Sequence, residues 1–455
     1  MASAAKKSEI PEKKSAKELA VVILAAGKGS RMKSSLPKVL HPIAGLPMVQ
    51  HIIRAAETLN PKKIIVVLSP GMDDVAAVAS PHEVAIQQQP KGTGDAVRAA
   101  LPVLEGFKGR VLVLYGDVPL TKPDTLDHLL THHDQGNGFG ATFLAMAPPN
   151  PTGYGRIFQN SDGTLNRIVE EADATEDEKL VRLCWGGVVV LEGEKLAERI
   201  EKIGTQNTQG ESYLVDIAKI LAAEGVATGV TRGDYAELRG VNSRAQLAEL
   251  EMAWQHRKRL DVMENGTTLE DPSTVYFSYD TKIGTDTTIG PSVVFGPNVV
   301  VENNVHIHPF CHIEGAVIKS NSSIGPFARL RPGTEIGSHA KIGNFVEVKN
   351  SKIGEGAKAN HLGYIGDAQL GAHSNFGCGA ITVNYDGKKK SKTVIGDHVM
   401  IGSNSSLIAP IEIEDGAYVA AGSTVTHKVP KDALAIGRAR QVNKEGLAAG
   451  RLKKE

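Results

Sequence analysis

The fold of the first half of the chain is decided by the stretch Leu24-Ala25-Ala26-Gly27-Lys28-Gly29-Ser30-Arg31-Met32. The apolar run 19–24 before it suits a buried parallel strand, and 49–59 behind it has the apolar spacing of a helix. The glycines let the backbone approach a ligand closely, so that free N–H groups can face phosphate oxygens. The stretch therefore predicts a phosphate-binding turn. A plain turn remains the alternative, because the pattern matches neither the P-loop nor the dinucleotide fingerprint.

Outward from this turn, apolar β-rich runs alternate with helical stretches as far as about residue 240. Such alternation predicts a mostly parallel α/β sheet that binds ligands at the carboxyl ends of its strands. We expect a hairpin-like insertion at 153–157 and 168–171. The expected strands are 19–24, 64–67, 84–86, 111–114, 141–145 and 188–191.

Polar residues follow two of these strands. The glycine-rich loop 87–96 carries amide side chains that can read a base edge, and Asp117 follows the strand 111–114. Mg²⁺ in nucleotide sites usually takes one or two protein carboxylates together with phosphate oxygens, so Asp117 is a candidate ligand. The alternatives are a solvated loop and an Asp that caps the next turn.

The composition limits the class of partner. Lys+Arg and Asp+Glu both number 51, which argues against nucleic acid or an anionic membrane as the main partner. We find no apolar run near the ~20 residues that span a bilayer. Three cysteines far apart in sequence suggest neither a disulfide framework nor a metal site, so we expect a cytoplasmic protein. Residues 1–18 are expected to be a disordered leader.

Beyond Pro272, aliphatic residues recur at six-residue steps, which is the hexapeptide repeat of a β-helix. We expect a phosphate-binding α/β domain at 19–242, a linker helix at 243–266, and the β-helix with its tail at 267–455. A loop around 384–390 should project from the coils. The repeat positions are 283, 289, 295, 301, 307 and 313, then 324, 330, 336, 342 and 348, then 395, 401, 407, 413, 419 and 425.

Polar residues are concentrated in the middle coils of this predicted β-helix. Cationic side chains there could hold a phosphate, and a neutral imidazole at His361 could take a proton from an amine. A solvated face and a structural histidine are the alternatives. His306, His308 and His312 should be surface residues, because a period of six turns them around the coil. The concentrated residues are Arg329, Arg331, Lys349, Asn360, His361, Tyr364, Asn375, Asn384, Tyr385 and Lys390.

Over nearly its whole length the chain resembles the family of bifunctional bacterial N-acetylglucosamine-1-phosphate uridyltransferases / glucosamine-1-phosphate acetyltransferases. The resemblance rests on motifs that follow one another along this chain in the same order as in the family. They are the stretch 24–32, Pro37-Lys38, Gly92-Thr93, Tyr115-Gly-Asp117, Gly153-Tyr-Gly155-Arg, Val169-Glu170, Gly240-Val-Asn242, Arg331-Pro-Gly, His361-Leu-Gly-Tyr364, Asn384-Tyr-Asp-Gly387 and Arg438.

For the amino-terminal half, the resemblance implies a Rossmann-like nucleotidyltransferase that transfers UMP from UTP to N-acetylglucosamine-1-phosphate. Arg31 and Lys38 would face the phosphates and act in catalysis, and Asp117 and Asn242 would hold Mg²⁺. Gly155 and Glu170 would contact the sugar. The residues implied for UTP or UDP-sugar binding are Leu24, Ala25, Ala26, Gly27, Lys38, Gln87, Gly92, Thr93, Gly155, Glu170 and Asn242.

For the carboxyl-terminal half, the resemblance implies a left-handed parallel β-helix that acetylates glucosamine-1-phosphate with acetyl-CoA. It would be a homotrimer with sites between subunits, and His361 would be the base. UTP and acetyl-CoA are then co-substrates. The residues implied for the sugar phosphate are Arg331, Lys349, Tyr364, Asn375 and Lys390, and those implied for acetyl-CoA are Asn384, Tyr385, Ser403, Ala421 and Arg438.

Two positions depart from the family pattern. Trp185 stands where the family has Asn, and an indole cannot make the hydrogen bond of that amide; Leu46 stands where Lys is usual. One alternative function is a monofunctional sugar-1-phosphate nucleotidyltransferase whose β-helix serves only for oligomerisation, against which His361 and the phosphate-binding set argue. The other is a non-catalytic scaffold, against which Asp117 and Asn242 argue.

Overall fold

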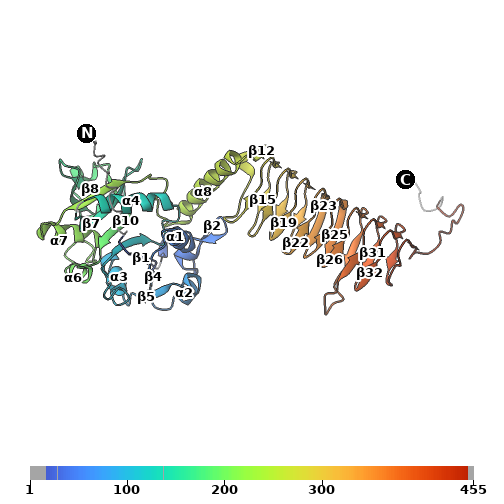
Figure 1. Cartoon of the computed structure of the whole chain (residues 1–455), viewed down its shortest axis with the longest axis horizontal. Coiled ribbons are helices and arrows are strands. Elements are labelled where there is room, and N and C mark those ends of the chain that lie inside the picture. Colours follow the sequence, from blue (N-terminus) through green and yellow to red (C-terminus); the bar gives the residue numbers. More distant parts are fainter. Residues whose placement is uncertain (1–16, 28, 137, 449–455) are drawn as a thin grey trace, which may run out of the picture. The chain divides into compact units, whose positions relative to one another are not determined.

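A computed structural model describes residues 17–27, 29–136 and 138–448 (Figure 1). The chain divides into two compact units, Met1–Trp254 and Gln255–Glu455. Most of the expected disordered leader, Lys28 of the glycine-rich turn and the last seven residues of the tail lie outside the described residues. Lys17 and Glu18 are described, and the Glu18 carbonyl accepts a hydrogen bond from Arg110 N–H at 2.8 Å.

The first unit is built on a twisted, mostly parallel sheet, as the sequence predicts. β10 is the antiparallel member, because it pairs antiparallel with both β6 and β7. β8 (Arg156–Gln159) and β9 (Leu165–Val169) form the expected hairpin at its side. Along the main path the order is β11 (Thr228–Arg232), β7 (Ala141–Met146), β10 (Cys184–Glu192), β6 (Arg110–Tyr115), β1 (Leu19–Leu24), β4 (Lys63–Leu68) and β5 (Glu83–Ile86).

Helices cover both faces of this sheet, and each face has its own hydrophobic core. One core packs against α3 (Thr93–Ala100), α6 (Leu196–Glu201) and α7 (Ile217–Ala223). The other packs against α1 (Met48–Glu57), α2 (Asp73–Ala79) and α4 (Pro123–Gln135). The small ribbon of β2 (Pro42–Ile43) and β3 (Leu46–Pro47) buries Leu46, so the departure at that position belongs to the core. The short α5 (Glu176–Lys179) follows the β8–β9 hairpin.

The linker helix α8 spans Arg244–Glu264, within the predicted range. Its first half belongs to the first unit, where the Glu251 carboxylate accepts a hydrogen bond from Ala44 N–H at 2.7 Å. Its second half belongs to the second unit, where the Gln255 side chain bonds both the N–H and the carbonyl of Phe277. Among the described residues, no helix combines the length and apolar character needed to cross a bilayer.

The second unit is a left-handed parallel β-helix with three faces of short strands. The first face contains β12 (Thr268–Leu269), β14 (Thr288–Ile289), β17 (His306–Ile307), β20 (Ser323–Ile324), β23 (Lys341–Lys349), β25 (Lys358–Gly366), β27 (Asn375–Phe376), β30 (Met400–Ile401), β33 (Tyr418–Val419) and β35 (Leu434–Ala435). The second contains β15 (Val294–Phe295), β18 (His312–Ile313), β21 (Arg329–Leu330), β28 (Ile381–Val383), β31 (Ser406–Ile408) and β34 (Thr424–Val425), and β23 and β25 run on into it. The third contains β13 (Lys282–Ile283), β16 (Val300–Val301), β19 (Ala316–Ile318), β22 (Thr334–Ile336), β24 (Lys352–Ile353), β26 (Ala368–Leu370), β29 (Thr393–Ile395) and β32 (Ile411–Ile413).

The repeat positions point into this β-helix, as the six-residue period predicts. All of them are buried except Ile283, which lies near the start and is partly exposed. Corner residues adopt left-handed backbone angles and recur every 17 or 18 positions, for example Asn304, Asn321 and His339. His373 and His398 are 25 positions apart, because the predicted loop is inserted between them; Figure 1 shows it projecting from the coils.

Candidate active sites

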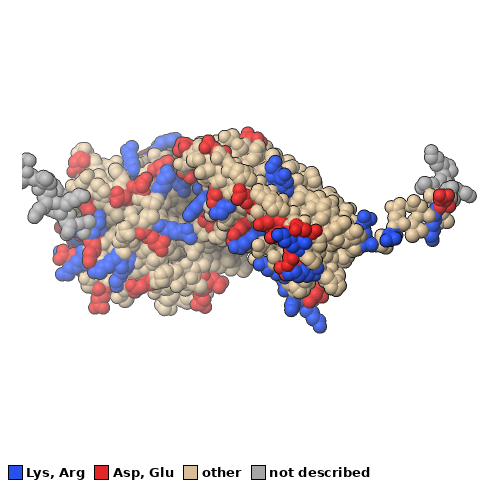
Figure 2. All heavy atoms as spheres, turned by 45° about the vertical axis from the view of Figure 1, so that its right-hand side comes forward, with Lys and Arg blue, Asp and Glu red and all other residues tan. Residues whose placement is uncertain are grey.

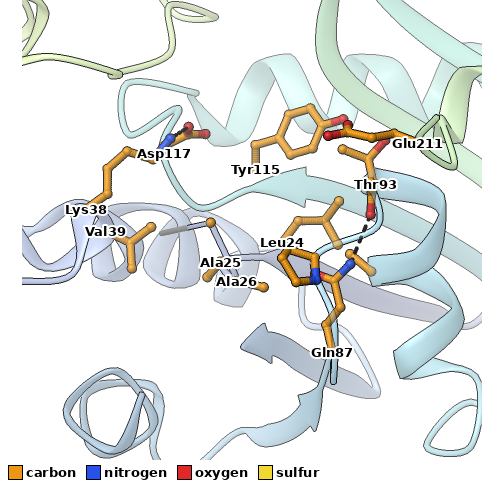
Figure 3. A pocket seen from close by; sticks show the side chains of 14 residues that line it. Leu24, Ala25, Ala26, Lys38, Val39, Gln87, Thr93, Tyr115, Asp117 and Glu211 are labelled. Atoms are coloured by element: carbon orange, nitrogen blue, oxygen red, sulfur yellow. Dashed lines mark hydrogen bonds and ion pairs between the residues drawn. The ribbon is translucent and has the colours of Figure 1, made fainter. Parts of the chain in front are cut away.

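A cavity of about 340 Å³ opens at the carboxyl ends of β1, β5 and β6 (Figure 3). The parallel strands place their C-terminal residues at one edge of the sheet, and so the predicted turn, base-reading loop and acidic residue meet there. The lining residues are Leu24, Ala25, Ala26, Gly27, Lys38, Val39, Gln87, Pro90, Gly92, Thr93, Ala96, Tyr115, Asp117 and Glu211.

The glycine-rich turn needs its glycine at position 29. Gly29 has φ +62°, and a Cβ there would overlap the side chain of Lys38. The turn therefore packs directly on the stem of Lys38, which begins the 3₁₀ segment Lys38–Leu40. Arg31 lies in the neighbouring 3₁₀ segment Ser30–Met32; it is exposed and does not line the cavity.

Three predicted residues converge at the mouth of this cavity. The ammonium of Lys38 forms an ion pair with the Asp117 carboxylate and donates a hydrogen bond to the Asn242 side-chain oxygen at 3.2 Å. Asn242 is held by its N–H, which donates to Gln246 Oε1 at 2.8 Å, and Val241 N–H donates to the Asp117 carbonyl at 2.9 Å. Two oxygen ligands from distant segments thus share one cation.

The base-reading loop is fixed by hydrogen bonds. The buried Gln87 amide donates to the Gly92 carbonyl at 3.1 Å and to Asp95 Oδ2 at 2.9 Å. The Thr93 hydroxyl accepts a hydrogen bond from Leu214 N–H at 3.0 Å. Gly92 has φ +106°, and a side chain there would collide with the Ser212 backbone. The loop therefore approaches the cavity in one defined conformation.

A second cavity of about 230 Å³ adjoins the first, and the two share Tyr115 and Asp117 as lining residues. A ligand in each would place its reacting atoms near Asp117. The other residues that line it are Val118, Gly153, Tyr154, Gly155, Glu170, Trp185, Gly186, Gly187, Leu238 and Gly240.

Burial shifts the pKa values of three side chains that line this second cavity. It raises the pKa of Glu170 to about 7, and the neighbouring carboxylates of Asp173 and Asp216 raise it further in the same direction. Burial also raises the pKa of Tyr154 to about 12 and raises that of Tyr115. The phenols therefore stay protonated and can donate hydrogen bonds, while Glu170 changes charge near neutral pH.

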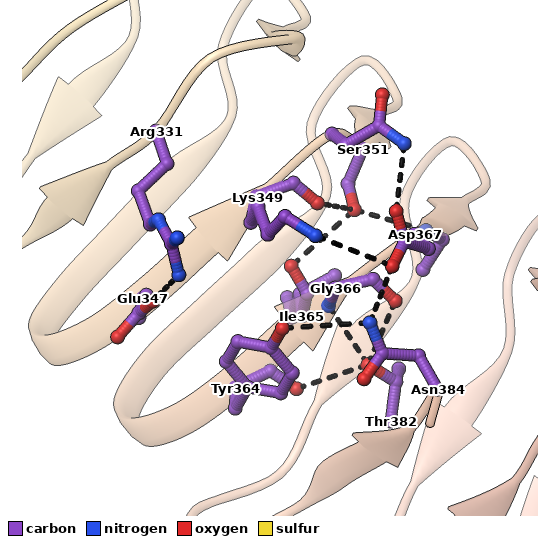
Figure 4. Close-up of polar contacts among 12 residues, drawn as sticks. Arg331, Glu347, Lys349, Ser351, Tyr364, Ile365, Gly366, Asp367, Thr382 and Asn384 are labelled. Atoms are coloured by element: carbon purple, nitrogen blue, oxygen red, sulfur yellow. Dashed lines mark hydrogen bonds and ion pairs between the residues drawn. The ribbon is translucent and has the colours of Figure 1, made fainter. Parts of the chain in front are cut away.

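Several of the predicted polar residues of the β-helix form a compact network around Asp367, in and just after β23, β25 and β28 (Figure 4). Asn384, which is buried, donates to Asp367 Oδ2 at 2.5 Å and lies 3.5 Å from the Tyr364 hydroxyl. Lys349 pairs with the same Asp367 at 3.5 Å. Lys390 contacts Lys349, and this contact lowers the pKa of Lys390. Two cations side by side with one carboxylate leave room for an anion.

Arg331 directly follows β21 and His361 lies in β25, and β23 pairs with both of these strands. Arg331 pairs with Glu347 at 2.7 Å, and Glu347 is the register partner of Tyr364. Asn344 is the register partner of His361, and its Oδ1 lies 2.8 Å from His361 Nδ1. An amide oxygen only accepts, so Nδ1 carries the proton and Nε2 of the exposed imidazole is free as a base.

The remaining predicted residues lie further along the β-helix. The Asn375 amide lies 3.2 Å from Met400 Sδ, and Tyr385 is exposed on the projecting loop with its hydroxyl bonded to the Gly387 carbonyl. Ser403 and Ala421 lie on successive coils, because the Ser403 carbonyl accepts from Gly422 N–H. Arg438 follows β35 and is exposed.

Tyr115, Asn344 and Asp367, the carboxylate of the β-helix network, are site residues that the sequence analysis does not include. Tyr115 ends β6 and lines both cavities, and its place at the carboxyl end of a strand was the available signal. Asn344 lies 17 residues before His361, which is the length of one coil of the β-helix. The coil length therefore predicts that the two side chains are neighbours.

Charges of both signs are interspersed over the face drawn in Figure 2. Within the described parts of the chain, His, Cys, Asp and Glu side chains form no group of three or more that could hold a metal ion. His306 and His308 stack on each other with ring centroids 4.2 Å apart. A metal held by protein atoms would therefore need an amide or a substrate oxygen as well.

Two sequence families match this arrangement. The MobA-like NTP transferase domain matches residues 21–205. The bacterial transferase hexapeptide family, whose unit is six repeats, matches residues 280–315, 315–350 and 392–427. The first match covers both cavities apart from their walls beyond residue 205, and the second covers the coils with Arg331 and Lys349.

Curated relatives match nearly the whole chain. The Bifunctional protein GlmU of Zymomonas mobilis subsp. mobilis is 48% identical over 432 residues, covering 94% of this chain and 96% of that protein. Proteins of the same name from Paramagnetospirillum magneticum and Paracoccus denitrificans are 48% and 47% identical, each over 95% of this chain and 96% of its own length.

Proposed function

This chain belongs to the family of bifunctional GlmU proteins, and we propose how its residues divide the work of the two activities. It is a transferase with uridyltransferase and glucosamine-1-phosphate acetyltransferase activities. We assign uridylyl transfer to the two joined cavities and acetyl transfer to the β-helix network. The observation that carries the first assignment is the convergence of Lys38, Asp117 and Asn242 where the cavities meet.

In the uridyltransferase site, UTP would occupy the first cavity and N-acetylglucosamine-1-phosphate the second. The turn 24–27 faces the phosphates, Gln87 and Thr93 face the base, and Gly155 and Glu170 face the sugar. A phosphate oxygen of the sugar attacks the α-phosphorus of UTP, and the bond to pyrophosphate breaks. The protein contributes alignment and positive charge, and Lys38 moves from Asp117 to the phosphates.

Asp117 and Asn242 fit a divalent cation. Their oxygens already converge on one positive charge, the Lys38 ammonium, and a carboxylate with an amide oxygen suits Mg²⁺ better than softer metals. Bound there with the phosphates, Mg²⁺ would neutralise charge that develops on the transferring group. Lys38 would then be released to bind phosphate oxygen.

In the acetyltransferase site, His361 Nε2 takes a proton from the 2-amine of glucosamine-1-phosphate. The amine attacks the thioester carbonyl of acetyl-CoA, an N–C bond forms, and the coenzyme leaves as its thiol after taking up the proton. Arg331, Lys349 and Lys390 hold the sugar phosphate, and Tyr364 and Asn375 orient the sugar. Asn384, Tyr385, Ser403, Ala421 and Arg438 line the coenzyme.

We also propose that the chain forms a homotrimer through an apolar ladder, the corner residues Phe310, Phe327, Phe345 and Leu362. These side chains are 45–56% exposed, and the three phenyl rings stack at 4.8 and 5.1 Å. Contiguous exposed apolar surface of this kind marks an interaction site. Leu362 follows His361 directly, so a neighbouring subunit on the ladder would also border the imidazole. UTP and acetyl-CoA, as intracellular metabolites, suit a cytoplasmic location.

An assay of both activities in one tube tests the assignment of residues. The protein is incubated with glucosamine-1-phosphate, acetyl-CoA, UTP and Mg²⁺, with one component omitted at a time. His361→Ala should abolish acetylation and spare uridylylation of N-acetylglucosamine-1-phosphate, and Asp117→Ala should do the converse. If both products still form at wild-type rates in the variants, the assignment is wrong.

A further inference from the structure

Trp185 is the largest apolar side chain that lines the second cavity, and none of the roles assigned above uses it. Polar side chains line the cavity as well, among them Tyr154 and Glu170, whose carboxyl lies against Gly155. Five glycines supply much of the remaining wall as backbone. A cavity lined by polar groups and one large apolar side chain fits a hydroxylated ligand that carries a single apolar substituent.

The indole is held firmly in place. The ring packs edge-on against the buried Phe143 ring, with centroids 5.1 Å apart, and the backbone N–H of Trp185 donates to the Gly155 carbonyl at 2.8 Å. The side chain is only 7% exposed. Tyr115, which lines both cavities, is its neighbour in the wall of this one. A rigid wall discriminates by size and polarity better than a mobile one does.

We propose that Trp185 determines the specificity of the sugar site by packing its indole against the methyl group of the 2-acetamido substituent. The uridyltransferase then prefers N-acetylglucosamine-1-phosphate to the free amine. This inference rests on the proposed function, which puts the sugar in the second cavity. A methyl group on an apolar wall is worth about 10- to 200-fold in selectivity, whereas an ammonium ion placed there loses water.

The test compares two substrates in the full-length protein, with UTP and Mg²⁺ and without acetyl-CoA. The ratio of kcat/KM for N-acetylglucosamine-1-phosphate to that for glucosamine-1-phosphate should fall about tenfold or more in Trp185→Ala and less in Trp185→Phe. Acetyl transfer should stay unchanged and shows that the variants fold. An unchanged ratio, or a larger loss with the amine through a cation–π contact, overturns the proposal. If the wild type uridylylates neither sugar, the proposed function fails instead.

A second measurement needs no change at Trp185. The chain has two tryptophans, and Trp254 is buried in α8 outside both cavities, so Trp254→Phe leaves Trp185 as the only indole. Titration with N-acetylglucosamine-1-phosphate should change the fluorescence of this variant with a midpoint near the KM for that sugar. Saturation of activity without any change in emission would contradict the contact.

Discussion

Glu170 is a residue whose charge depends on its surroundings. Its pKa rises from 4.5 to about 7 because it is buried and lies near Asp173 and Asp216. In the unfolded chain the carboxyl ionises near 4.5, so between pH 4.5 and 7 the folded state holds the proton more tightly. Folding is therefore penalised increasingly as the pH rises through this window, and the penalty is complete above about 7.

Glu170→Gln should remove that penalty. The melting temperature of the variant should exceed that of the wild type, and the difference should grow from pH 5 to pH 7 and then level off. Calorimetry across this range measures it, with the exposed Glu105→Gln as the matched control. A difference that does not vary with pH would contradict the raised pKa.

Asn344 acts on the acetylation chemistry only through His361. Because its side-chain oxygen accepts from Nδ1–H, it holds the tautomer that leaves Nε2 free. Asn344→Ala should lower kcat for acetyl transfer by at least about tenfold, as part of the 10²–10⁴ that a general base supplies. Asn344→Asp keeps an acceptor and should restore part of the rate. Equal losses in both variants, or any loss in uridylyl transfer, would argue for a purely structural role.

At the scale of elements, β10 carries an irregularity that shapes the sugar site. Its register against β7 shifts between Trp185 and Val189, and Gly187 in this bulge has φ +77°. A Cβ at Gly187 would lie 2.6 Å from the Tyr115 ring. Bulges re-aim side chains near active sites, and this one turns Trp185 and Tyr115 toward the same cavity.

Gly187→Ala should therefore displace Tyr115 and lower kcat/KM for uridylyl transfer by more than tenfold, in addition to about 1–3 kcal/mol of backbone strain. Gly163→Ala is the matched control, because Gly163 has φ +83° in the β8–β9 turn and open space around its Cβ position. Steady-state kinetics and melting temperatures of both variants separate strain from the clash. Similar activity losses in the two would contradict the role of the bulge.

Elements with strong periodic patterns could be predicted from the sequence, and irregular ones could not. Buried strands such as β1 and β6 are continuous apolar runs, and the β-helix repeats one aliphatic residue every six. β11 was missed because Thr228-Gly229-Val230-Thr231-Arg232 has a single large apolar residue and is recognised only through its pairing with β7. The interruptions of the six-residue period reflect corners of different length, which only the coil geometry explains.

In the candidate sites, too, some residues could be predicted from the sequence and others could not. Residues that follow recognisable strands, such as Asp117 and Gln87, line the first cavity, whereas Arg31 is exposed in its 3₁₀ segment and is not among the lining residues. Contacts between coils, such as that of Asn344 with His361, depend on register, which the sequence specifies only once the coil length is known.

At the scale of the whole molecule, the proposed trimer makes acetyl transfer depend on assembly and leaves uridylyl transfer independent of it. The apolar ladder borders His361, whereas both joined cavities lie entirely within the first unit. Dilution of the wild type below the dissociation constant of the trimer should therefore lower the specific activity of acetylation alone.

Phe327→Asp places a charge in the middle of the ladder, between Phe310 and Phe345. Because a desolvated carboxylate in an apolar interface is strongly unfavourable, the variant should sediment as a monomer and lose most of its acetyl transfer. Leu180→Asp is the control, since Leu180 is 76% exposed in the first unit and lies outside the ladder. Analytical ultracentrifugation measures the oligomeric state of both variants, and the two assays measure their acetyl transfer and uridylyl transfer. A fully active Phe327→Asp monomer would show that the site is complete in one chain, and a variant that still forms trimers would place the interface on another face.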